Sequence, residues 1–197
     1  MSQEKTTVQV ATIAKDKPAL PDPGDLMAVV AHYQGSLLRY VGRMLGGSDN
    51  EVEDIVQETF IRLHFQISKE GRDSVKNLTT WLFKTSQNLT IDAFRKGARR
   101  VKVLESASKA ALLTNEQAGK ELDVMGEVLR HEAREVALRE LGELDEQYRQ
   151  VVLLKIIQGM TLREVAEVAG ISTSLANYRL NKGLEELTQR LKKAGVV

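Results

Sequence analysis

Residues 161–180 read Thr-Leu-Arg-Glu-Val-Ala-Glu-Val-Ala-Gly-Ile-Ser-Thr-Ser-Leu-Ala-Asn-Tyr-Arg-Leu. The pattern predicts a short helix, a tight turn at Gly170 and a second helix. Thr161 and Glu164 have the spacing of a capping box, in which each side chain bonds the other residue's backbone. Gly170 suits the turn because glycine tolerates positive φ. Ser172 or Thr173 would cap the second helix. This arrangement is a helix-turn-helix, which places its second helix in the DNA major groove.

The second helix of this unit carries a polar outer face. Asn can bond adenine through two hydrogen bonds, whereas Ser and Lys bond bases or phosphates. Leucines from Leu180 to Leu191 recur at helical spacing and predict the opposite, inward side. A solvated face of an ordinary helical bundle has a similar composition, but the capped turn before it favours DNA binding. The outer face comprises Ser174, Asn177, Tyr178, Asn181 and Lys182.

A second segment with nucleic-acid character lies far upstream, on a helix expected from Thr79 or Thr80 to about Lys96. Trp81 stands at its entrance and can stack on a base. Asn88 follows two turns later and can read an unpaired base edge. Alternatively, Trp81 is a core residue, Asn88 is a surface amide, and the cations complement the helix dipole. The segment's cations, which suit phosphates, are Lys84, Arg95, Lys96, Arg99 and Arg100.

A line of mostly acidic residues precedes that helix. Asp54, Gln57, Glu58 and Ile61 recur at i, i+3, i+4 and i+7, which places them on one face of a helix. Such a line is usually solvated, yet with Ile61 at its end it is also a plausible docking strip for a basic partner helix.

Composition narrows the possible classes of protein. The 197 residues include 42% hydrophobic residues and only three prolines, all before Gly24, which favours an all-α fold with packed cores. Cysteine is absent, which excludes disulfides and thiolate metal sites and agrees with a cytoplasmic location. The three histidines lack ligand spacing, so no metal or cofactor is expected. No hydrophobic run reaches membrane-spanning length, and no catalytic or phosphate-loop motif appears.

The order of these features predicts two small helical domains joined by a flexible linker. Residues 1–23 carry the prolines and are expected to be a mobile tail. Residues 24–100 form the first domain, with helices opening at Asp25 and at a capping box from Ser48 to Glu51. Residues 101–131 are an Ala-rich linker, and residues 132–197 form the second domain, with a helix over 136–141, another over 146–158 and the helix-turn-helix. Net charge is only +1, but basic, acidic and basic stretches follow one another along the chain.

These motifs, in this order, resemble bacterial RNA polymerase sigma factors of the extracytoplasmic-function group, within the sigma-70 family. The segment from Glu53 to Leu63 is similar to region 2.2, and that from Trp81 to Lys96 to regions 2.3 and 2.4. The segment from Leu141 to Leu154, followed by that from Gly159 to Ala166, is similar to region 4. The resemblance implies an alternative sigma factor. Such a subunit catalyses nothing alone and directs the core enzyme to promoters.

The resemblance also implies roles for the residues named above. The strip of Asp54, Gln57, Glu58 and Ile61 would bind the β′ clamp of core RNA polymerase, with the β flap as a further contact. Trp81, Lys84, Asn88, Arg95, Lys96, Arg99 and Arg100 would bind the melted −10 element, with Asn88 in the pocket for a flipped base. Ser172, Thr173, Ser174, Asn177, Tyr178, Arg179, Asn181 and Lys182 would bind the −35 element. An anti-sigma factor is an expected partner.

One departure from the family pattern concerns the recognition helix. Residues 174–178 read Ser-Leu-Ala-Asn-Tyr where Gly-Thr-Val-Lys-Ser is frequent, so the −35 sequence is expected to differ.

Two other functions fit parts of the sequence. A stand-alone helix-turn-helix regulator would bind operator DNA without polymerase. An adaptor or anti-regulator would use both helical units to bind protein and would not depend on DNA or salt.

Overall fold

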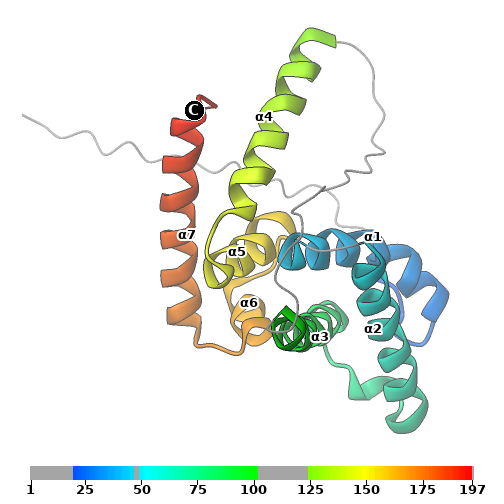
Figure 1. Ribbon diagram of the computed structural model, residues 1–197. Helices are drawn as coiled ribbons and strands as arrows, with labels where there is room; N and C mark the ends of the chain where they lie inside the picture. Colours follow the sequence, from blue (N-terminus) through cyan, green and yellow to red (C-terminus); the bar gives the residue numbers. More distant parts are fainter. Residues whose placement is uncertain (1–19, 47–48, 102–123, 197) are drawn as a thin grey trace, which may run out of the picture.

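The structure is a computed structural model that describes residues 20–46, 49–101 and 124–196 (Figure 1). Within these ranges every regular element is a helix, so the all-α prediction is confirmed. The predicted tail to Ala19 and the linker up to Asp123 lie outside the described residues. The elements are α1 (Leu26–Leu45), α2 (Asp49–Glu70), the 3-10 turn η1 (Arg72–Ser74), α3 (Leu78–Val101), α4 (Val124–Gly142), α5 (Glu146–Val152), the π-helical η2 (Leu153–Ile157), α6 (Leu162–Ala169) and α7 (Thr173–Lys193).

Helices α1, α2 and α3 form the N-terminal unit. Asp25 caps α1 as predicted, because its Oδ1 accepts a hydrogen bond from the Ala28 N–H at 3.0 Å. Gly46 ends α1 in the left-handed conformation, with φ of 56°. Ser48 of the expected capping box lies outside the described residues. Apolar side chains of α1 and α2 are buried against α3 in a core that includes Val29, Leu37, Val41, Val56, Leu63, Leu82 and Phe83.

Helix α3 is longer than the sequence predicted. It starts at Leu78, because the Asn77 side chain accepts the Thr80 N–H at 3.0 Å and thereby satisfies a donor of the first turn. It then continues to Val101 instead of ending near Lys96. Segment 97–101 contains no proline, and its single glycine weakens a helix without breaking it. Helix α3 therefore carries its basic residues on its own last turns.

The C-terminal unit contains the predicted helix-turn-helix. Both halves of the capping box form: the Thr161 N–H donates to Glu164 Oε2 at 2.8 Å, and the Glu164 N–H donates to Thr161 Oγ1 at 3.3 Å. Gly170 ends α6 with φ of 65°, and Ser172 caps α7 by accepting the Leu175 N–H at 3.2 Å. These three local features fix how α7 leaves the turn.

Helix α4 begins at Val124, well before the helix expected over 136–141. The added segment lacks proline and contains three Glu and two Arg, which tolerate a helix interior. Helix α4 contacts α7, and in Figure 1 its C-terminal end lies nearer to α7 than its N-terminal end does. The next predicted helix is confirmed from Glu146 to Ile157, although its second half is π-helical.

The two units contact each other. Helix α3 lies against α6, and α1 touches α5 (Figure 1). Buried apolar side chains of both units belong to one continuous cluster, to which α5 contributes Val151 and Val152. No local sequence pattern predicts this contact between the units.

Candidate nucleic-acid interface

Helices α2 and α3 enclose an open cleft of about 380 Å³. Trp81 and Asn88, predicted as a pair from their spacing on α3, both line it. Asn88 is exposed, whereas Trp81 is half-buried and packs partly against the core. Trp81 is therefore partly a core residue and also lines the cleft, and its stacking on a base stays a prediction. The opposite wall comes from α2 and comprises Arg62, Phe65, Gln66, Lys69 and Glu70.

The α2 wall supplies cleft residues that the sequence analysis did not identify. Arg62, Gln66 and Lys69 recur at i, i+4 and i+7, which is the spacing of one helical face. That spacing was available from the sequence, but nothing in it showed that this face lies opposite Trp81. The wall brings two cations and one amide close to an aromatic side chain, which are the groups that hold single-stranded nucleic acid.

The cations predicted on α3 are spread along the helix. Lys84 is exposed. Arg95 is exposed too, and lies 3.6 Å from Asp92 in a surface ion pair, which contributes little to stability. The side chains of Lys96, Arg99 and Arg100 lie outside the described residues, although the backbone of α3 reaches them.

The predicted docking strip lies on the outside of α2. Asp54, Gln57 and Ile61 are exposed. Glu58 is paired with Arg62 at 2.8 Å, and its side chain keeps 43% of its surface exposed. Phe65 follows Ile61 by one helical turn and is 67% exposed, against 48% for Ile61. The strip therefore runs from acidic at its start to apolar at its end.

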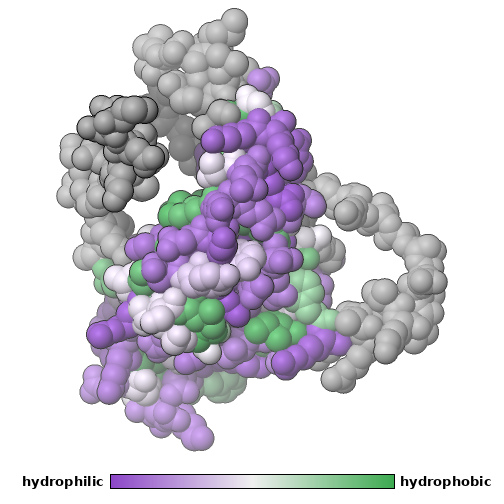
Figure 2. All heavy atoms as spheres, turned by 90° about the vertical axis from the view of Figure 1, so that its left-hand side faces the viewer, coloured by the Kyte–Doolittle hydropathy of each residue, from purple (hydrophilic) through white to green (hydrophobic). Residues whose placement is uncertain are grey.

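The first turns of α7 present their predicted face to solvent. Figure 2, which views the molecule from the side of α7, shows a mostly hydrophilic surface with separate hydrophobic spots. Ala176 and Leu180 point inward, and Lys182 pairs with Glu185 at 2.8 Å, a hydrogen bond that raises the pKa of Lys182. The exposed residues are Ser172, Thr173, Ser174, Leu175, Asn177, Tyr178, Asn181 and Lys182.

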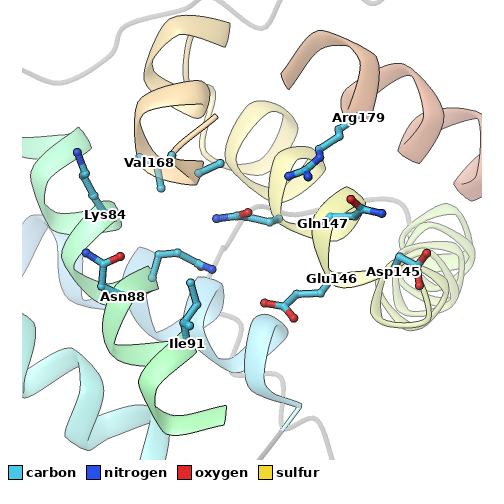
Figure 3. Close-up of a pocket in the computed structure, with 12 residues that line it drawn as sticks. Lys84, Asn88, Ile91, Asp145, Glu146, Gln147, Val168 and Arg179 are labelled. Carbon is cyan, nitrogen blue, oxygen red and sulfur yellow. The ribbon is translucent and has the colours of Figure 1, made fainter. Parts of the chain in front are cut away.

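Arg179 lies on the side of α7 that borders the N-terminal unit and is not part of this exposed face. It is half-buried and lines a cavity of about 550 Å³ between the two units (Figure 3). Lys84 and Asn88 face this cavity from α3, while Asp145 and Glu146 face it from the start of α5. Asn88 therefore borders both the α2–α3 cleft and the inter-unit cavity. In this arrangement the C-terminal unit lies directly across part of the predicted −10 surface.

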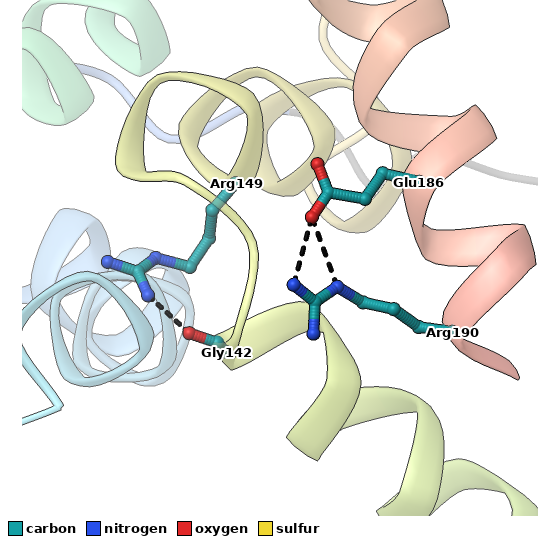
Figure 4. Close-up of polar contacts among 4 residues, drawn as sticks. All are labelled: Gly142, Arg149, Glu186 and Arg190. Carbon is teal, nitrogen blue, oxygen red and sulfur yellow. Dashed lines mark hydrogen bonds and ion pairs between the residues drawn. The ribbon is translucent and has the colours of Figure 1, made fainter. Parts of the chain in front are cut away.

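Polar contacts also join the two units outside that cavity. Asn77 Nδ2 donates to Glu164 Oε1 at 3.0 Å. Arg149 donates from one nitrogen to the Gly142 carbonyl at 2.6 Å (Figure 4) and from the other to the Met44 carbonyl at 3.3 Å, across the units. Burial lowers the pKa of Arg149. Figure 4 also shows Glu186 paired with Arg190 at 2.9 Å, a contact within α7.

A fully buried tyrosine, Tyr40, lies where the two units meet. The Tyr40 hydroxyl donates to Gln87 Oε1 at 2.5 Å, and Gln150 of α5 is a further hydrogen-bond partner. Burial raises the pKa of Tyr40, and the contact with Gln150 opposes that rise. Since Tyr40 lies on α1, Gln87 on α3 and Gln150 on α5, this buried group spans both units.

In the described ranges, no group of three or more His, Asp or Glu side chains is arranged to hold a metal ion. Of the helices in the same ranges, none combines the length and apolar character needed to cross a membrane.

Comparison with known proteins identifies relatives of both units. Residues 29–100 match the family described as Sigma-70 region 2, and residues 134–187 match the one described as Sigma-70, region 4. The ECF RNA polymerase sigma factor SigW of Bacillus subtilis is 30% identical over 167 residues, covering 83% of this chain and 87% of SigW. RNA polymerase sigma factor CnrH of Cupriavidus metallidurans is 30% identical over 165 residues, covering 80% and 82%.

Two solved structures share the fold. The sigma factor RpoE of Bartonella quintana, in complex with the anti-sigma factor NepR, aligns with a TM-score of 0.67 at 19% identity, covering 85% of this chain and 97% of RpoE. CnrH in complex with the cytosolic domain of CnrY aligns with a TM-score of 0.56 at 24% identity, covering 85% and 88%.

Proposed function

The chain belongs to the extracytoplasmic-function group of the sigma-70 family, and from that membership we propose how it selects promoters. Members are specificity subunits of RNA polymerase that direct promoter-specific initiation and are not enzymes themselves. The proposal is that this chain binds core polymerase in the cytoplasm, reads duplex −35 DNA with α7 and captures melted −10 DNA with α3.

The α2–α3 cleft is the proposed −10 site. Asn88 lies exposed in it and offers an amide that can bond an unpaired base edge, while Trp81 offers an aromatic face. Arg62 and Lys69 would hold the backbone of the captured strand. Capturing unpaired bases offsets part of the unstacking cost, which is a few kcal/mol per step. Lys84, Arg95, Lys96, Arg99 and Arg100 would hold the DNA backbone along the rest of α3.

The first turns of α7 are the proposed −35 site. A rigid capped turn presents exposed amide, hydroxyl and ammonium groups, which are the groups that read base edges in the major groove. Arg179 turns toward the inter-unit cavity, so we assign it to a phosphate contact that forms only when that cavity opens.

The acidic-to-apolar strip on α2 is the proposed contact for the β′ clamp. Its carboxylates suit a basic partner, and Ile61 with Phe65 supplies the apolar area that gives an interface its affinity. For the β flap we propose the end of η2, where Ile156 is 49% and Ile157 44% exposed.

An anti-sigma factor is the proposed regulatory partner. RpoE was solved in complex with the anti-sigma factor NepR, and CnrH in complex with the cytosolic domain of CnrY. By fold likeness alone, the same two helical units are available here for a regulator to grip.

The proposed activity requires the two units to separate. Asp145 and Glu146 stand opposite Lys84 and Asn88, and negative carboxylates in that place oppose a DNA strand. Opening would replace the contacts of Asn77 and Arg149 with contacts to DNA and polymerase.

The observation that carries the proposal is the exposure of Asn88 in a cleft with Trp81, on the unit that matches region 2. The test is run-off transcription with purified core polymerase on a random promoter library. The expected result is a set of transcripts that share one −35 and one −10 motif and that require this chain. DNA binding of equal strength without core enzyme would instead support a stand-alone regulator. Absence of any chain-dependent transcript would reject the proposal.

A further inference from the structure

The recognition face of α7 contains an apolar side chain at its centre. Tyr178 is 54% exposed, and Leu175, one turn earlier, is 38% exposed. Residues three apart are neighbours on a helix surface, so the two side chains form one apolar patch. On an otherwise polar face, this patch offers an apolar surface that a partner could cover.

The orientation of this patch is fixed by the packing behind it. Ala176 is fully buried and Leu180 nearly so, which holds the opposite side of α7 against the domain. Gly183 continues that side, where a Cβ would lie only 2.9 Å from Val152 Cγ2. Helix α7 cannot rotate to bury Tyr178 without breaking this contact. The patch therefore points outward whenever the unit is folded.

The neighbours of the patch define what it meets. Asn177 and Asn181 are exposed beside it, and a bidentate amide is the usual partner of adenine N6 and N7. Among the groups on base edges in the major groove, the apolar one is the C5-methyl of thymine. An A·T base pair therefore offers an adenine edge to the Asn amides on one strand and a thymine methyl group to the Tyr178 ring on the other.

We infer that Tyr178, supported by Leu175, reads thymine in the −35 element through its C5-methyl group. This inference rests on the proposed function, because it names the bases that the proposed −35 site selects. Tyr178 is then a specificity-determining residue, and its ring, more than its hydroxyl, makes the contact.

Deoxyuridine tests the inference directly, because it lacks only the methyl group of thymine. Promoters would first be selected with the holoenzyme from the random library. Each −35 thymine would then be replaced by deoxyuridine, and holoenzyme affinity for the duplex measured. The wild type should lose about fourfold at the contacted thymine, the effect of one buried methyl group. Tyr178→Ser should bind the thymine promoter more weakly and show no further loss with deoxyuridine.

Two variants act as controls. Tyr178→Phe keeps the ring and should remain sensitive to deoxyuridine. Met27→Ala removes a 78% exposed side chain on α1, outside every proposed site, and should behave as wild type. Selected −35 elements without thymine, or equal sensitivity in wild type and Tyr178→Ser, would overturn the inference while leaving the sigma function standing. Failure to select any promoter would instead contradict the proposed function itself.

Discussion

The side chain of Asn77 donates a hydrogen bond to that of Glu164, 3.0 Å away, although 87 positions separate them. Each residue also helps to cap a helix: Asn77 accepts from the Thr80 N–H at the start of α3, and Glu164 from the Thr161 N–H at the start of α6. The contact therefore joins the first turn of α3 in one unit to the first turn of α6 in the other.

Fixing that contact covalently should stop initiation. The chain has no native cysteine, so Asn77→Cys with Glu164→Cys creates the only thiol pair. Joined by a short, reducible thiol crosslinker, the units cannot separate, and run-off transcription should fall to background and return on reduction. The control pair Glu186→Cys with Arg190→Cys links residues within α7 and should leave transcription intact. Full activity of the crosslinked Asn77–Glu164 variant would show that the units need not part.

Asn88→Ala should weaken −10 selection. Asn88 is exposed, so truncation leaves folding intact but removes the amide proposed to read an unpaired base. Discrimination between matched and mutated −10 promoters should fall about tenfold, in the range of one good base contact. Open-complex formation measures this, and polymerase affinity should stay unchanged. Gln189→Ala removes an exposed amide elsewhere and serves as control. Unchanged discrimination would rule out this role for Asn88.

Glu58→Lys should weaken polymerase binding. The change reverses a charge in the proposed docking strip and loses a surface ion pair with Arg62, which costs the fold less than about 1 kcal/mol. A like charge facing a basic partner should lower affinity for core enzyme by about tenfold or more. Glu132→Lys makes the same charge change on exposed α4. Equal affinities of both variants in a pull-down titration would remove the strip from the interface.

Gly183→Ala should loosen α7. The new Cβ would lie 2.9 Å from Val152 Cγ2 and 3.2 Å from Tyr148 Cβ, so α5 and α7 must shift apart. Overpacking of this kind costs about 1–3 kcal/mol, partly offset by the better helix propensity of alanine. Gly142→Ala meets nothing within 4 Å and should be neutral or stabilising. Urea unfolding would show a lower midpoint for Gly183→Ala alone. A matching rise for both variants would contradict close packing at Gly183.

Alkaline pH should destabilise the chain through Tyr40. Burial raises the pKa of Tyr40 in the folded state, whereas the pKa of a tyrosine in the unfolded chain is about 10. The unfolded state therefore loses its proton first, so the stability is fully present below that pH and declines as pH rises above it. Urea unfolding of Tyr40→Phe should show a smaller decline at high pH. At neutral pH the variant should lose about 1–2 kcal/mol, because Gln87 loses a buried partner. If the stability of wild type and of Tyr40→Phe declined identically at high pH, Tyr40 would not be the cause of the decline.

Local patterns in the sequence predicted much of the fold. Capping at Asp25 and Ser172 and the turn at Gly170 depend on neighbouring residues, and all three appear as expected. The early start of α4 and the π-helical η2 were missed. Helix α4 contacts α7 and η2 contacts α6, and such contacts between elements cannot be read from local patterns.

The candidate site was predictable only in part. The spacing of Trp81 and Asn88 indicated one shared helix, and the structure places both at one cleft. Arg62 and Lys69 were missed because they enter the cleft from another helix. The direction of Arg179 and the Tyr40–Gln87–Gln150 group were missed for the same reason, since both depend on contacts between units.

The continuous apolar cluster has a consequence for how the chain is recruited. Parting the units exposes hydrocarbon to water, which is unfavourable in proportion to the area uncovered. Promoter DNA presents a charged, hydrated surface and compensates little of that. In the proposed mechanism, nonpolar surface of the core polymerase would cover what the chain uncovers, so that recruitment and activation would be a single exchange of surfaces.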